Sequence, residues 1–142
     1  MPAFRDAAGR HLIAAQSLVS VGHSDDADHL AGFAAECGLK AVLCGPGGVA
    51  VPTAGAPTVG GSRLGHLPRL WADAATHMHG RLGGLGVSVA AELLGHNPFV
   101  AWTVDDRYEA TGTIAGAVAA RHIRAAGHVV DLVEKLAIAG AL

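Results

Sequence analysis

Apolar positions in the first third of the chain follow two different spacings. Gln16 to Val21 (QSLVSV) is a short apolar, β-branched run, which predicts a buried strand. From Asp25 onward the apolar positions recur at helical spacing until Gly38, a residue type that often ends a helix. Lys40 to Cys44 (KAVLC) predicts a second buried strand. Strand, helix and strand in this order are typical of a β-α-β unit in a parallel sheet.

The middle of the chain contains a loop-like segment followed by a helical one. Gly45 to Gly61 is dense in Gly and Pro and almost without charge, so we expect an ordered loop that holds one short strand at Val49 to Val51. Leu64 to Leu82 has apolar residues at helical spacing and predicts a helix. This helix is expected to begin near Leu67, because Pro68 is tolerated only in a first turn.

The last third again alternates between the two patterns. Val87 to Leu93 and Phe99 to Val104 predict strands, and Thr111 to Ala126 predicts a helix that a glycine ends. Val129 to Val133 predicts a further strand, although the same residues also fit an amphipathic helix. We prefer the strand, because a short β-branched run follows a clear helix stop. The alternation predicts an α/β fold for residues 1–142 as a single domain, a three-layer sandwich with a mostly parallel sheet.

Composition and charge narrow the class of protein. A content of 51% apolar and 15% charged residues, with a mean hydropathy of +0.37, excludes intrinsic disorder. A net charge of -2 argues against a nucleic-acid partner. No uninterrupted apolar run reaches the roughly 18 residues of a membrane span, so no membrane partner is expected. Cys37 and Cys44 match no zinc-site spacing, which leaves the cytoplasm as the expected compartment.

The densest group of reactive side chains lies where the first predicted strand meets its helix (HSDD). In open α/β sheets, ligands bind at the carboxyl ends of strands. His23, Asp25 and Asp26 are therefore candidate catalytic residues, with the imidazole as nucleophile, general base or metal ligand. The alternative is structural, with an aspartate as helix cap and the histidine at the surface. His77 and His79 point to different faces of a helix, and no metal site is predicted.

A predicted strand, loop and helix near the C-terminus carry small residues and hydroxyls at the helix start. Such a helix N-terminus lets the backbone approach a phosphate, whose charge the helix dipole favours. Residues 99–134 resemble the phosphate-binding segment of flavodoxin-like domains, with Tyr108 before the loop and the turn ATGTIA within it. The resemblance implies a flavodoxin- or Rossmann-like sheet that binds FMN or a nucleotide. The implied cofactor-binding residues are Tyr108, Thr111, Gly112 and Thr113, with the hydroxyls of Thr111 and Thr113 on the phosphate. In flavodoxins this unit opens the domain, whereas here it stands near the end of the chain.

A second resemblance points to phosphoryl transfer. Leu18 to Leu30 and Gly86 to Phe99 are similar to parts of the mannose-type carrier domain of the bacterial sugar phosphotransferase system. That family has a phosphorylated histidine after its first strand, which His23 would match. Glu92 and the turn GHNP would stand for a later acidic turn of the family.

Three functions therefore remain open from the sequence. The first is a small-molecule-binding domain that recognises a phosphate-bearing ligand, a nucleotide or a flavin, through Thr111 to Thr113. The second is an enzyme or phosphocarrier centred on His23. The third is a non-enzymatic accessory protein, because faces rich in Ala and Gly can pack against copies of the same chain. A homo-oligomer is expected, and whether the protein is an enzyme stays open.

Overall fold

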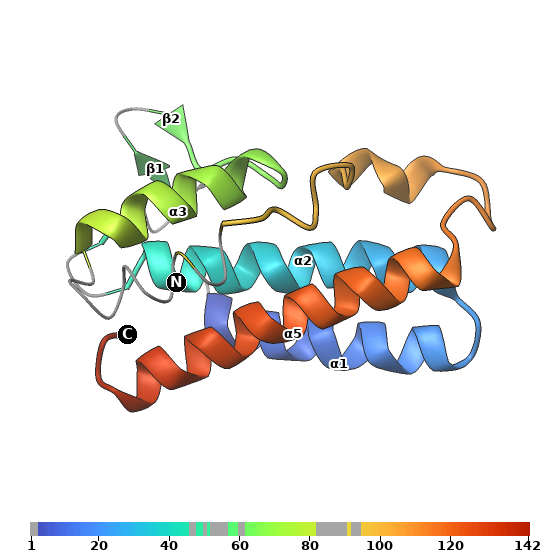
Figure 1. Ribbon diagram of the computed structural model, residues 1–142, viewed down its shortest axis with the longest axis horizontal. Helices are drawn as coiled ribbons and strands as arrows, with labels where there is room; N and C mark the ends of the chain where they lie inside the picture. The colour runs from blue at the N-terminus through green and yellow to red at the C-terminus, as the bar shows by residue number, and fades with distance from the viewer. Residues whose placement is uncertain are drawn as a thin grey trace.

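The computed structural model of the protein describes residues 3–45, 48–49, 51, 57–59, 62–81, 91 and 95–142. In these residues the fold is a helical bundle (Figure 1). Its helices are α1 (Phe4–Ser20), α2 (Ser24–Leu43), α3 (Arg69–Arg81) and α5 (Gly116–Ile138), with a short 3-10 helix, η1 (Val104–Tyr108). The strands β1 (Thr58–Val59) and β2 (Ser62–Arg63) form a two-residue antiparallel ladder, in which Thr58 pairs with Arg63 and Val59 with Ser62.

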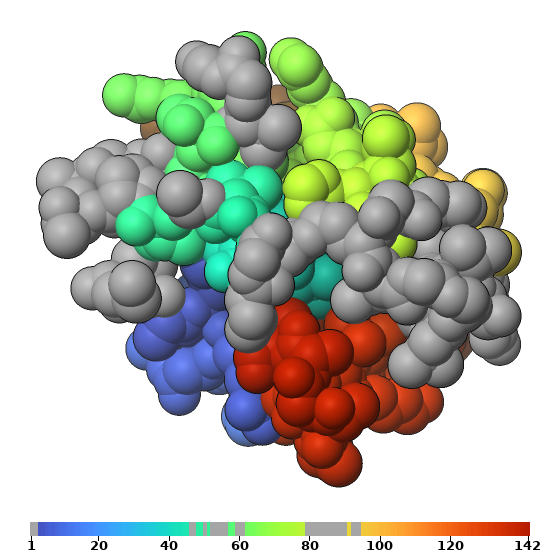
Figure 2. Space-filling view, turned by 90° about the vertical axis from the view of Figure 1, so that its left-hand side faces the viewer, coloured from blue at the N-terminus to red at the C-terminus, as the bar shows by residue number. Residues whose placement is uncertain are grey.

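Helix α2 occupies the centre of the bundle. It packs against α1 and α5 on one side and against α3 and η1 on the other, and α1 also touches α5 (Figure 1). An end view of the molecule shows α1 beside the C-terminal part of α5, with α3 on the far side of α2 (Figure 2). Since it has neighbours on both sides, α2 contributes more buried residues than any other described helix.

The predicted α/β sandwich with a parallel sheet is wrong. Within the described part of the chain, the only paired strands are those of the β1–β2 ladder. Gln16 to Val21 is the end of α1 and the turn after it, whereas Lys40 to Cys44 continues α2 to its last residue and its C-cap. Both segments are short apolar runs, and a run of five or six residues fits a buried helix as well as a buried strand. In this protein both segments are helical, and α1 and α2 pack against each other.

The C-terminal predictions have a mixed outcome. Val129 to Val133 lies inside α5, so the amphipathic helix weighed as the alternative is correct and the strand is wrong. The helix also passes through Gly127 without a break. Phe99 to Val104 forms a turn that leads into η1 and is not a strand. Val87 to Leu93 lies outside the described residues except for Ala91.

The middle segment agrees with its expected helix. α3 begins at Arg69, two residues after the predicted start at Leu67. The expected strand at Val49 to Val51 is described only at its two end residues, and neither of these is in a strand. Most of the Gly- and Pro-rich loop from Gly45 to Gly61 lies outside the described residues.

Small residues on α2 let its neighbours approach closely. A Cβ at Gly32 would overlap the indole of Trp102, and one at Gly38 would lie 2.6 Å from Cγ1 of Val129. The Trp102 ring is 1% exposed and its indole N–H donates a hydrogen bond to the backbone oxygen of Asp28 at 3.1 Å. The high alanine and glycine content therefore serves close helix packing. No helix in the described segments is long and apolar enough to span a bilayer.

Candidate functional site

The predicted catalytic residues lie at the N-terminal end of α2. His23 is the exposed residue that precedes the helix, and Asp25 and Asp26 are in its first turn. The Asp25 carboxylate accepts two hydrogen bonds, from the backbone N–H of Gly112 and from that of Ile114, each at 2.8 Å. These two bonds lower the pKa of Asp25, because they favour its charged form. Asp26 is exposed.

The predicted phosphate-binding loop is held by that same carboxylate. Tyr108, Thr111 and Thr113 are exposed, and the Thr113 hydroxyl donates to the backbone oxygen of Ala110 at 2.6 Å. Gly112 has a φ of +90°, which only glycine adopts readily. The fold therefore brings the two predicted sites together at one end of the bundle. The backbone N–H groups expected to face a phosphate face Asp25 instead.

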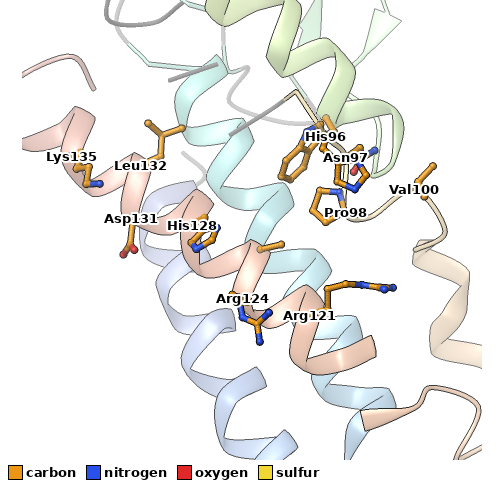
Figure 3. A pocket seen from close by; sticks show the side chains of 12 residues that line it. His96, Asn97, Pro98, Val100, Arg121, Arg124, His128, Asp131, Leu132 and Lys135 are labelled. Atoms are coloured by element: carbon orange, nitrogen blue, oxygen red, sulfur yellow. The ribbon is translucent and has the colours of Figure 1, made fainter. Parts of the chain in front are cut away.

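A cavity lies elsewhere, between α5 and the turn at residues 95–100. Its volume is about 820 Å³. One wall is formed by α5, and the opposite wall by the turn together with Trp71 of α3. Figure 3 shows His96, Asn97 and Pro98 on the turn side, with Arg121, Arg124, His128, Asp131, Leu132 and Lys135 along the helix.

The α5 wall is basic. Arg121, Arg124, His128 and Lys135, which we call the basic face of α5, are all exposed and follow the three- and four-residue spacing that places side chains on one side of a helix. Among the described residues, Asp131 is the single acidic side chain that lines the cavity. No hydrogen bond or ion pair joins the four basic side chains to another residue in the described parts of the chain. The positive charge is therefore available to a ligand.

The opposite wall is mixed in polarity and fixed in place. Its apolar side chains are Trp71, Pro98 and Val100, which we call the apolar wall, and His96 and Asn97 line the cavity beside them. The Trp71 ring lies 5.8 Å from that of Phe99. Asn97 holds the turn, since its side-chain amide donates to the backbone oxygen of Pro68 at 3.2 Å and its side-chain oxygen accepts the N–H of Phe99 at 2.9 Å.

A buried ionisable pair lies behind the cavity wall. Asp28 of α2 and His122 of α5 are 1% and 4% exposed, and Oδ1 of Asp28 lies 2.6 Å from Nδ1 of His122. The other ring nitrogen of His122 lies 3.1 Å from the backbone oxygen of Pro98, and the ring stacks on Phe99 at 4.8 Å. The pair thus connects the centre of the bundle to the turn.

A third α2 carboxylate fixes the chain before α3. Glu36, 2% exposed, accepts the backbone N–H of Leu67 at 3.1 Å and lies 3.0 Å from Nδ1 of His66. Nζ of Lys40 donates to the same carboxylate at 3.4 Å. These contacts set the position from which α3 carries Trp71 to the cavity.

The chain contains no metal cluster among its described residues. No group of three or more His, Cys, Asp or Glu side chains is arranged to hold an ion there. Cys37 and Cys44 form no disulfide with described residues, and burial raises the pKa of Cys37, which disfavours a reactive thiolate.

Comparison with known proteins found no match among family models, curated proteins or solved structures.

Sequence reasoning missed the basic face of α5. The signal was present, since Arg121, Arg124, His128 and Lys135 follow helical spacing. It was hidden because the helix was predicted to stop at Gly127, which separates the two arginines from the lysine. The apolar wall gave no comparable signal, because the turn and Trp71 meet only in the tertiary structure.

Proposed function

We propose that the protein is a small-molecule-binding helical domain that recognises a phosphate-bearing ligand in the cavity between α5 and the 95–100 turn. The observation that carries this proposal is the basic face of α5. Its cations make no ion pair with the rest of the described chain, and they lie across the cavity from the apolar wall. Natural ligand sites combine such an apolar surface with a few polar groups that orient the ligand.

The chemistry of the basic face favours phosphate. Arg121 and Arg124 offer planar guanidinium groups, which can bind a phosphate through two parallel hydrogen bonds, and Lys135 adds a flexible point charge. The 820 Å³ volume lies within the range of roughly 300–1,000 Å³ of small-molecule sites. A ligand with a flat ring beside its phosphate, such as a nucleotide or FMN, would place the ring against Trp71 and Pro98.

The cavity is a better-supported location for the phosphate than the loop at Thr111 to Thr113. In that loop the N–H groups of Gly112 and Ile114 already donate to a carboxylate of the same chain. A phosphate there would have to displace Asp25 and overcome its negative charge. Along α5 the cations make no ion pair with the described residues, and Asp131 is the acidic side chain beside them in the cavity.

Calorimetric titration with FMN and with nucleotides tests the proposal. In an Arg121→Ala/Arg124→Ala variant we expect the affinity to fall at least about tenfold, which corresponds to about 1.4 kcal/mol of binding free energy. Arg10→Ala on α1 is the matched control, since it removes an exposed arginine outside the cavity. Added salt should weaken binding further.

Two results would contradict the proposal. The first is a wild-type protein that binds none of these ligands. The second is an equal loss of affinity in the cavity variant and in Arg10→Ala, which would indicate nonspecific charge attraction.

A further inference from the structure

One hydrogen bond sets the spacing between the two walls of the cavity. The turn at residues 95–100 is tied to the residue that precedes α3 through Asn97, whose amide donates to the backbone oxygen of Pro68. Its tie to α5 is the contact between Nε2 of His122 and the backbone oxygen of Pro98 at 3.1 Å. His122 directly follows Arg121 in the sequence and lies on the opposite, buried side of the same helix.

The surroundings of His122 fix the orientation of its ring. A backbone carbonyl only accepts hydrogen bonds, so Nε2 must carry the hydrogen that it donates to Pro98. Nδ1 faces the Asp28 carboxyl at 2.6 Å, and the ring lies flat against Phe99, the next residue of the turn. The imidazole is therefore held from three sides and is oriented by α2 toward the turn.

We infer that His122 is a positioning residue of the cavity, which holds the apolar wall at the distance from the basic face of α5 that the ligand requires. Asp28 acts through His122 by fixing the ring, as an outer carboxylate orients the histidine of a metal or catalytic site. This inference rests on the proposed function for its effect on ligand binding. Neither residue lines the cavity, so neither contacts the ligand.

Two substitutions separate positioning from plain stability. The side-chain amide of His122→Gln can reach the place of Nε2 and keep the bond to Pro98, whereas that of His122→Asn takes the place of Nδ1 and keeps only the contact with Asp28. Both variants lose the ring stacking on Phe99, and each loses one polar contact, His122→Gln that with Asp28 and His122→Asn that with Pro98. Because the Gln variant leaves the buried Asp28 without its partner, a role in stability alone would weaken ligand binding more in His122→Gln than in His122→Asn. Urea unfolding measures the stability of each variant.

The expected result is a split between the two variants. FMN or nucleotide affinity should stay near the wild-type value in His122→Gln and fall about tenfold in His122→Asn, the effect of one lost hydrogen bond that holds a wall in place. Equal affinities, measured under conditions in which urea unfolding shows both variants to be folded, would overturn the inference. So would stronger binding by the Asn variant.

A measurement without ligand separates this inference from the proposed function. A proton–nitrogen spectrum of the wild-type histidine ring should show a hydrogen on Nε2, and the backbone amide signal of Phe99 should shift more in His122→Asn than in His122→Gln. A bare Nε2, or equal Phe99 shifts, would overturn the positioning role. If the spectra agree with expectation but the wild type binds neither FMN nor a nucleotide, the proposed function fails while the placement of the turn by His122 stands.

Discussion

Three carboxylates of α2 and the basic face of α5 differ in how their charges are used. On α2, the carboxylates of Asp25, Asp28 and Glu36 each accept or share hydrogen bonds with a different segment of the chain, and two of the three are almost fully buried. The basic face of α5 is exposed and makes no ion pair with the described residues, although Glu134 of the same helix pairs with Arg5 of α1 at 2.6 Å. The three α2 carboxylates therefore connect the fold, whereas the cations of the basic face do not.

The strongest test of this contrast is the removal of Asp28. Asp28→Ala leaves Nδ1 of the buried His122 ring without its partner, and breaking one side of a buried pair costs about 3–5 kcal/mol. Urea unfolding measures the change in the free energy of unfolding. Asp26→Ala is the matched control, because Asp26 is exposed in the same helix and should cost less than about 1 kcal/mol. Equal losses in the two variants would show that the buried pair has no special role.

Removal of Glu36 should have a smaller but clear effect. Glu36→Ala leaves the buried N–H of Leu67 without an acceptor and takes a partner from Lys40, for a loss of about 1–3 kcal/mol. The exposed Glu109→Ala provides a control of the same chemistry. Thermal or urea unfolding measures the stability of both variants. If Glu36→Ala is as stable as Glu109→Ala, the Glu36 carboxylate does not stabilise the fold.

The hydrogen bonds of Asp25 to the loop at Gly112 should make the free energy of unfolding depend on pH in the acidic range. Two backbone N–H groups lower its pKa below the ordinary 3.8 in the folded protein, so its contribution is fully present above pH 3.8 and is lost as the pH falls through the lower folded value. Unfolding at a series of acidic pH values should show a shallower decline in Asp25→Asn than in the wild type. Identical acid profiles would contradict the role given to this carboxylate, and a nuclear magnetic resonance titration of Asp25 measures its pKa directly.

The smallest effect on the free energy of unfolding is expected from substitutions in the basic face of α5. Substitution of Arg121, Arg124 and Lys135 by alanine should change the free energy of unfolding by no more than about 0.5 kcal/mol each, since exposed residues without partners contribute little. Ligand affinity should fall in the same variants. A large loss of stability would show that these cations stabilise the fold as the α2 carboxylates do, and would contradict the difference drawn between the two helices.

Parts of this fold could be predicted from its sequence, and the physical reason for each failure is specific. The start of α2 at the aspartates and the position of α3 follow helical spacing and were predicted to within a few residues. QSLVSV and KAVLC predict strands, because short runs of β-branched and aliphatic residues are typical of buried strands. In the structure KAVLC is buried or half-buried, whereas QSLVSV is exposed or half-buried at the end of α1, with Val21 68% exposed.

The candidate site was predictable only in its local chemistry. A negative charge does meet the loop at Gly112, but it comes from Asp25, whose distance in the sequence gave no sign of that contact. Gly127 was taken as a helix stop, whereas packing of α5 on α2 offsets the intrinsic cost of a helical glycine. The basic face thus became visible only when α5 proved continuous.

The two tryptophans lie in two different places, and this makes the molecule its own optical reporter. Trp71 borders the cavity, whereas Trp102 is packed over Gly32 with its N–H bound to the backbone of Asp28. Since the chain has only these 2 tryptophans, fluorescence from a Trp71→Phe variant arises from Trp102 alone and follows the docking of η1 on α2. Subtracting the Trp102 emission from the wild-type emission leaves that of Trp71, which borders the cavity. Ligand binding and unfolding can therefore be followed in one sample by intrinsic fluorescence.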